Sequence, residues 1–94
     1  MTNGTKFITK DFAEGEKLFS QDDVGDYIFI IINGSVEICR EANGKKEVLT
    51  RMSSGDIPGE MAVLTDEPRC ASGIAVEHTR VIMVKDHTLR LALL

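Results

Sequence analysis

The chain is poor in the residues that mark several classes of small protein. Its two cysteines, Cys39 and Cys70, lie far apart and form no CxxC pair. We therefore expect free thiols in a reducing cytosol rather than a disulfide framework. The longest apolar run, residues 27–32, is far too short to cross a membrane. The first residues lack the basic and apolar regions of a secretory signal. Together these absences predict a cytoplasmic protein with no membrane contact.

Positive charge is also scarce. Lys and Arg number 11 against 15 Asp and Glu, which gives a net charge of -4. A nucleic-acid surface needs clustered Lys and Arg to displace counterions, so we expect no direct nucleic-acid binding by this segment. An anionic ligand would have to be attracted locally, by a single arginine and backbone dipoles. A length of 94 residues indicates one small domain with a modest core.

Short apolar segments separated by turn signals indicate an all-β sandwich or barrel. Strands are expected over residues 6–12, 17–20, 27–32, 35–40, 45–52, 74–76 and 81–84. The run 27–32 is apolar on both faces and rich in β-branched residues, which is typical of a strand buried on both sides. The segment 35–40 alternates, with Val36 and Ile38 facing one way and Glu37 the other.

Two Asn-Gly pairs, Asn33-Gly34 and Asn43-Gly44, each predict a two-residue hairpin turn because both residue types tolerate a positive φ. Asp86 is a candidate N-cap, and the leucines that follow it suggest a short C-terminal helix. The pattern predicts one antiparallel β domain with little helix.

The most informative segment is 55–72, which places two glycines, a carboxylate and a short helix-like run ahead of a lone arginine. Gly59 removes a Cβ where the backbone would approach a ligand closely. The turn that follows would direct the free N–H groups near Met61 and Ala62 at an anion.

Arg69 would bind two phosphate oxygens in a bidentate manner that Lys cannot match. Glu60 would accept a hydrogen bond from a hydroxyl. A simpler interpretation pairs Arg69 with Asp66 or Glu67 on a solvated loop. Local chemistry alone leaves both interpretations open.

The segment resembles the phosphate-binding cassette of cyclic nucleotide-binding domains, as in the bacterial catabolite activator protein and the protein kinase A regulatory subunit. The matching pattern is Gly-Asp-x-x-Gly-Glu-x-Ala-x-Leu over 55–64, followed by Pro-Arg-x-Ala-Ser over 68–72. Segments 12–19 and 24–36 resemble the family's opening strands and central hairpin, so the likeness spans roughly residues 7 to 90. It implies a mostly β fold, an antiparallel β-roll of jelly-roll type, with a short cassette helix and a short C-terminal helix.

The resemblance also implies roles for individual residues. Glu60 and the backbone of Gly59 would bind the ribose 2′-hydroxyl, and Arg69 would bind the cyclic phosphate. The remaining ligand contacts implied are the backbone N–H groups of Ala62, Cys70 and Ala71, and the side chains of Ile38, Leu49 and Thr50 near the base. For these last three, ordinary core packing remains an equal alternative.

Three departures from the family pattern bear on function. Cys70 stands where relatives carry Ala, Ser or Thr, and a thiol is a weak donor, which favours cAMP over cGMP. Pro58 replaces a residue that is often large and apolar. The helix that lids the base in the family is expected to be missing from residues 1–94, which we otherwise interpret as a single cyclic nucleotide-binding domain.

These features predict a non-catalytic regulatory module that binds a cyclic nucleoside monophosphate, cAMP before cGMP, with no further cofactor. A homodimer partner or an effector domain would lie outside this chain. The alternative is a degenerate fold that binds a protein partner and no nucleotide. A cupin-like metalloenzyme would need clustered histidines, whereas His78 and His87 have no metal-ligand spacing.

Overall fold

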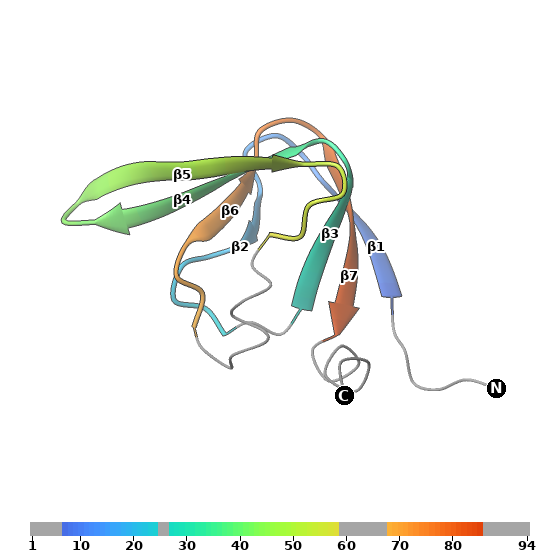
Figure 1. Cartoon of the computed structure of the whole chain (residues 1–94), viewed down its shortest axis with the longest axis horizontal. Helices are drawn as coiled ribbons and strands as arrows, with labels where there is room; N and C mark the ends of the chain where they lie inside the picture. Colours follow the sequence, from blue (N-terminus) through green and yellow to red (C-terminus); the bar gives the residue numbers. More distant parts are fainter. Residues whose placement is uncertain (1–6, 25–26, 59–67, 86–94) are drawn as a thin grey trace.

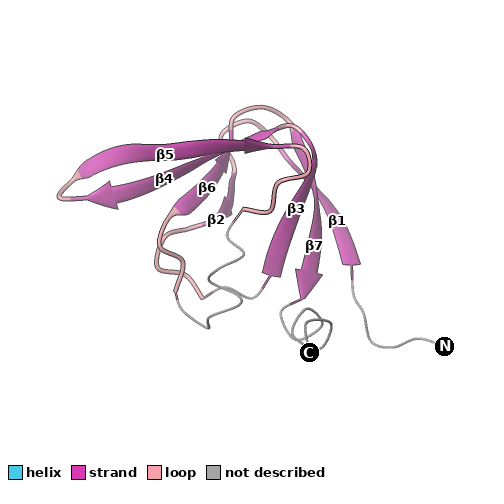
Figure 2. Ribbon diagram, viewed as in Figure 1, coloured by secondary structure: helices cyan, strands magenta, loops and turns pink. Residues whose placement is uncertain are grey.

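The computed structural model describes residues 7–24, 27–58 and 68–85. Seven strands follow one another along this part of the chain (Figure 1), and it contains no helix (Figure 2). They are β1 (Phe7–Phe12), β2 (Lys17–Phe19), β3 (Tyr27–Asn33), β4 (Ser35–Ala42), β5 (Lys45–Ser53), β6 (Ser72–Ala75) and β7 (Thr79–Lys85). A three-stranded sheet has the order β1-β7-β3, and a four-stranded sheet has the order β2-β6-β4-β5. All pairings are antiparallel. The predicted antiparallel β-roll is therefore confirmed, built as two sheets rather than one closed barrel.

The core is formed by side chains of both sheets. Ile31 of β3 is 1% exposed, and Val81 of β7 and Val36 of β4 are fully buried. The cluster around them consists of Phe12, Leu18, Phe19, Phe29, Ile38, Ala71 and Ala75. In β3 and β4 the buried residues of the cluster are spaced by two, which places them on one face of each strand, whereas Leu18 and Phe19 are consecutive in β2. Burying a Leu, Ile, Val or Phe side chain contributes about 1.5–3 kcal/mol, so this cluster is the main source of stability.

The connection at Asn33-Gly34 differs from the prediction. β3 pairs with β7 and β4 pairs with β5 and β6, so the two strands that flank this turn belong to different sheets. A type I′ hairpin needs a positive φ at both central residues, whereas here only Gly34 has one, at 107°. The hairpin prediction at this position is wrong, and Gly34 instead forms a sharp corner between the sheets.

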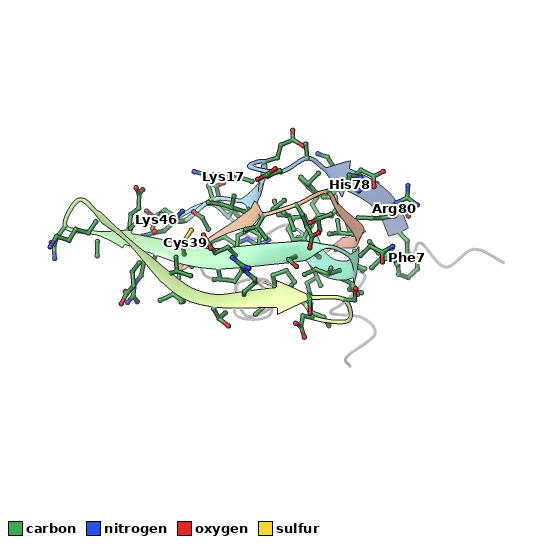
Figure 3. The ribbon with its side chains drawn as sticks, turned by 90° about the horizontal axis from the view of Figure 1, so that it is seen from above. Phe7, Lys17, Cys39, Lys46, His78 and Arg80 are labelled. Atoms are coloured by element: carbon green, nitrogen blue, oxygen red, sulfur yellow. The ribbon has the colours of Figure 1, made fainter. Side chains whose placement is uncertain are left out.

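The second Asn-Gly pair does form a hairpin. Asn43 and Gly44 have φ values of 55° and 76°, as a type I′ turn requires, and β4 pairs with β5 from Ser35 to Ala42. The register slips between Ile38 and Cys39, so Leu49 of β5 is the extra residue of a β-bulge. This hairpin extends beyond the other strands, with Lys46 at its far end (Figures 1 and 3).

Most expected strands agree with those observed to within two residues. The run 27–32 is buried on both faces at Ile28 and Phe29, both 4% exposed, as its composition predicted. Both predicted helices fall on segments outside the described residues. The described part of the chain contains no helix of the length and apolarity that a membrane crossing requires.

Candidate ligand-binding site

The backbone of Arg69 is fixed by the turn that joins β2 to β3. Asp22 N–H donates to the Arg69 carbonyl over 2.7 Å, and Arg69 N–H donates to the Asp23 carbonyl over 2.8 Å. An antiparallel bridge between Val24 and Pro68 continues this pairing by one residue. Asp22 has a φ of 74°, a conformation that Asp tolerates better than most residues. The arginine is therefore tied to a segment more than forty positions earlier in the sequence.

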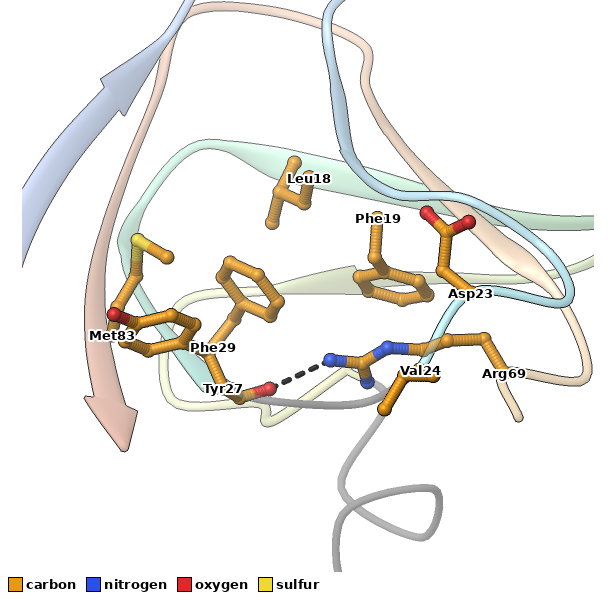
Figure 4. Close-up of a pocket in the computed structure, with 8 residues that line it drawn as sticks. All are labelled: Leu18, Phe19, Asp23, Val24, Tyr27, Phe29, Arg69 and Met83. Atoms are coloured by element: carbon orange, nitrogen blue, oxygen red, sulfur yellow. Dashed lines mark hydrogen bonds between the residues drawn. The ribbon is translucent and has the colours of Figure 1, made fainter. Parts of the chain in front are cut away.

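The side chain of Arg69 turns into the interior of the roll (Figure 4) and is only 3% exposed. Its Nη2 donates a 2.7 Å hydrogen bond to the backbone carbonyl of Tyr27. Its guanidinium carbon lies 4.5 Å from the centre of the Phe19 ring and 5.6 Å from that of Phe29. A buried charge is costly unless polar partners and ring faces compensate for lost water. The side chain of Arg69 is therefore not solvated, whereas Asp66 and Glu67, its partners in the simpler interpretation, lie outside the described residues.

Arg69 lines a cavity of about 200 Å³. Its walls are Leu18, Phe19, Asp23, Val24, Tyr27, Phe29, Arg69 and Met83 (Figure 4). The lining combines apolar side chains with one cation and one carboxylate, and polar and apolar atoms contribute about equally to it. Polar groups that converge beside apolar side chains can orient a small ligand.

The other described candidate residues lie away from this cavity's lining. Ala71 is 5% exposed and Ile38 is 8% exposed, and both belong to the core cluster. Thr50 lies opposite Ile38 across β4 and β5, and Leu49, at the bulge, is 44% exposed. Cys70 is exposed and, like Cys39, is a free thiol, as expected. The structure thus groups Ile38, Leu49 and Thr50 on one hairpin, while Arg69 precedes β6.

Four candidates, Gly59, Glu60, Met61 and Ala62, lie outside the described residues. The pairing of Glu60 with Arg69 on one ligand therefore stays a prediction. Pro58, the last described residue before this gap, is fully buried.

Sequence reasoning missed the aromatic surroundings of Arg69. Three of the chain's five aromatic residues, Phe19, Tyr27 and Phe29, line the cavity. The Phe19 and Phe29 rings stack with centres 5.7 Å apart and planes inclined by 29°. Tyr27 and Phe29 share a strand face by their spacing of two, but only the folded chain brings Phe19 beside them.

A second charged group lies on the outside of the three-stranded sheet. Arg80 Nε and Nη2 donate to the two carboxylate oxygens of Asp11, over 3.0 and 3.3 Å. His78 Nε2 lies 3.2 Å from the same carboxylate (Figure 3 shows His78 and Arg80). The hydrogen bond from Arg80 holds the pKa of Asp11 below its ordinary value. The described residues contain no group of three His, Cys, Asp or Glu side chains that could hold a metal ion.

Fold and site together define a small antiparallel β-roll domain that holds one arginine in its interior. The profile of the cyclic nucleotide-binding domain matches residues 9–93, and the chain belongs to that family. The predicted family resemblance is thereby confirmed.

Three relatives illustrate the family. The chain is 33% identical over 81 residues to a CRP-like cAMP-activated global transcriptional regulator of Mycobacterium tuberculosis, covering 85% of this chain and 36% of that protein. It is 36% identical over 70 residues to the cAMP-dependent protein kinase regulatory subunit of Mycosarcoma maydis, covering 74% of this chain and 13% of the other. The EAL enzyme Bd1971, solved in cAMP-bound and cGMP-bound forms, superposes with a TM-score of 0.83 at 32% identity, covering 87% of this chain and 22% of that one. The chain thus spans about a third or less of the length of these proteins.

Proposed function

We propose that this chain is a non-catalytic regulatory module that binds a cyclic nucleoside monophosphate, with cAMP preferred to cGMP. The observation that carries the proposal is the buried guanidinium of Arg69, held at its backbone by Asp22 and Asp23. In a chain with a net charge of -4, this is a local site of positive charge. A desolvated arginine fork is the group best suited to a phosphodiester.

The other contacts proposed follow the family pattern. Glu60 and Gly59 bind the ribose, and the N–H groups of Ala62, Cys70 and Ala71 complete the phosphate site. Ile38, Leu49 and Thr50 of the β4–β5 hairpin approach the base. The exposed Leu49 and Thr50 are available for such a contact, since neither contributes to the core cluster.

The preference for cAMP over cGMP depends on the residue at position 70. Bd1971 was solved with either nucleotide, so the fold itself accommodates both. Cys70 offers a thiol, a weak donor to a guanine, and this supports a preference for cAMP. We place the module in the cytoplasm, where its free thiols would stay reduced. The effector it controls, and any dimer partner, would lie outside residues 1–94.

Calorimetric titration with cAMP and cGMP tests the proposal directly. Ligand at a hundred times its Kd should stabilise the fold by about 2.7 kcal/mol. Arg69→Ala should weaken binding by about 2–5 kcal/mol, because the desolvated phosphate loses its charge partner. Arg51→Ala is the matched control, since that arginine is 62% exposed on β5. Absence of heat and of thermal stabilisation at millimolar nucleotide would reject the proposal.

One observation favours a second function. The Arg69 guanidinium already donates to the Tyr27 carbonyl and stacks on two rings, which suits an arginine with a purely structural task. The domain would then bind a protein partner without nucleotide. Under that function Arg69→Ala would lower the melting temperature and cAMP would leave it unchanged.

A further inference from the structure

We propose that Phe19 is the positioning residue that sets the guanidinium of Arg69 for phosphate binding. Its ring is the nearer of the two that contact this group, at 4.5 Å against 5.6 Å for Phe29. The effect on phosphate affinity rests on the proposed function, whereas the placement of Arg69 by Phe19 stands on the geometry alone.

Several contacts hold Arg69, and three of them come from the part of the chain that the structure describes around β2 and β3. The β2–β3 turn bonds its backbone, the Tyr27 carbonyl accepts from Nη2, and Phe19 covers the guanidinium (Figure 4). In the first two of these contacts the partner is a backbone group, which a side-chain substitution does not remove. Phe19 is a side-chain support and, of the two rings, the nearer one. An arginine that loses this contact regains rotamer freedom that binding must then restrict.

The Phe19 ring is itself fixed in place. A Cβ added at Gly73 would lie 2.7 Å from both Cε2 and Cζ of the ring, closer than such atoms approach. The φ of Gly73 lies outside the left-handed region, so the backbone does not require glycine there. The missing side chain instead makes room for the ring, which is 8% exposed and stacked on Phe29. A ring confined on both sides can hold a cation in one position.

Phe19→Leu tests the inference, with Phe12→Leu as the matched control. Both phenylalanines are buried members of the same core cluster, but Phe12 does not line the cavity around Arg69. Loss of a desolvated cation–π contact should weaken cAMP binding about five- to thirtyfold in Phe19→Leu. In Phe12→Leu the affinity should stay within about twofold. Equal losses in the two variants would overturn the inference. If Phe19→Leu does not fold, Phe19→Met takes its place.

A double mutant distinguishes an effect of Phe19 on Arg69 from a general effect of Phe19 on the fold. In an Arg69→Ala background, Phe19→Leu should cause no further loss of affinity, because the group it acts through is gone. Additive losses would contradict the inference.

A ligand-free measurement keeps this inference distinct from the proposed function. The Arg69 Nε–Hε resonance in a ¹⁵N-correlated NMR spectrum should carry a ring-current shift that falls to the smaller contribution of Phe29 in Phe19→Leu and is unchanged in Phe12→Leu. If the wild-type protein binds no cyclic nucleotide, the proposed function fails while this measurement still decides the placement of Arg69. An Arg69 signal unchanged by Phe19→Leu would overturn the placement.

Discussion

The side-chain amide of Gln21 pairs with the backbone of Glu41 and continues the hydrogen-bond ladder of β4 beyond Ser72, where β6 begins. The last pair between β4 and β6 is Cys39 opposite Ser72. Beyond it, Gln21 Nε2 donates to the Glu41 carbonyl over 3.2 Å and Glu41 N–H donates to Gln21 Oε1 over 2.8 Å. The Gln21 N–H also donates to Ser72 Oγ. The same turn bonds the backbone of Arg69, so this amide links the projecting hairpin to the candidate site.

Gln21→Met should therefore destabilise the domain although Gln21 is only half-buried. The substitution conserves length and removes two hydrogen bonds, each of which contributes about 0.5–1.5 kcal/mol. The melting temperature should fall by about 4–8 °C for each kcal/mol lost, as measured by thermal denaturation. Glu14→Met, in an exposed turn, is the control and should leave the melting temperature nearly unchanged. Equal melting temperatures for the two variants would contradict this role of the Gln21 amide.

The two Asn-Gly turns predict different costs for the same substitution. At Gly44, which has open space around it, alanine meets only the strain of a positive φ, about 1 kcal/mol. At Gly34 the added Cβ would also lie 2.6 Å from the His78 carbonyl oxygen and contact Thr79 Oγ1. Thr79 is fully buried and bonded to Ser35, so it cannot withdraw. Gly34→Ala should therefore cost clearly more than Gly44→Ala, by about 1–3 kcal/mol in chemical denaturation. Similar losses of unfolding free energy in Gly34→Ala and Gly44→Ala would contradict this prediction and would show that the backbone around Gly34 can move to admit a Cβ.

Asp11 should contribute to the loss of folding stability at low pH. Its pKa is lowered in the folded state, first by the hydrogen bond from Arg80. A lowered carboxyl pKa gives stabilisation that is complete above about pH 5 and is lost as the pH falls through the folded-state value. Asp11→Asn should flatten the dependence of melting temperature on pH below about pH 5. His78→Gln, which keeps the Arg80 bonds, should retain most of that dependence. If the melting temperature of Asp11→Asn falls with pH as steeply as that of the wild type, Asp11 makes no such contribution.

Cys70→Thr should shift nucleotide preference toward cGMP. A hydroxyl is a stronger hydrogen-bond donor than a thiol, and one added hydrogen bond corresponds to about 1 kcal/mol, or roughly fivefold in affinity. Cys70 is exposed, so the substitution should leave the core unaffected. Competition titration with both nucleotides measures the ratio, and Cys70→Ala is the control. A ratio identical in the Thr and Ala variants would remove Cys70 from the determinants of selectivity.

Local sequence predicted the strands well and their partners only in part. Asn43-Gly44 joins two strands that pair with each other, and its turn forms as the dipeptide predicts. Asn33-Gly34 carries the same signal, yet β3 and β4 part into different sheets there. A dipeptide sets where the chain can turn, whereas the choice of partner depends on distant strands such as β7, which no local pattern specifies.

The candidate site, like the strand pairing, could be predicted only in part from local sequence. Arg69 was identified from a motif of consecutive residues, and its burial follows from the fold. Phe19 and the Tyr27 carbonyl went unnoticed because they reach Arg69 from separate strands. The requirement for glycine at position 73 could not be predicted for the same reason, because it depends on the position of the Phe19 ring in the folded chain.

The bonds that hold the Arg69 backbone to Asp22 and Asp23 also bear on when the site forms during folding. Contacts between segments so distant in sequence carry the entropy of closing a long loop and are made late. We therefore expect Arg69 to take its place only after the turn between β2 and β3 has formed. A fragment that carries the cassette alone should therefore bind no phosphate, and affinity should emerge in a single step as the whole domain folds.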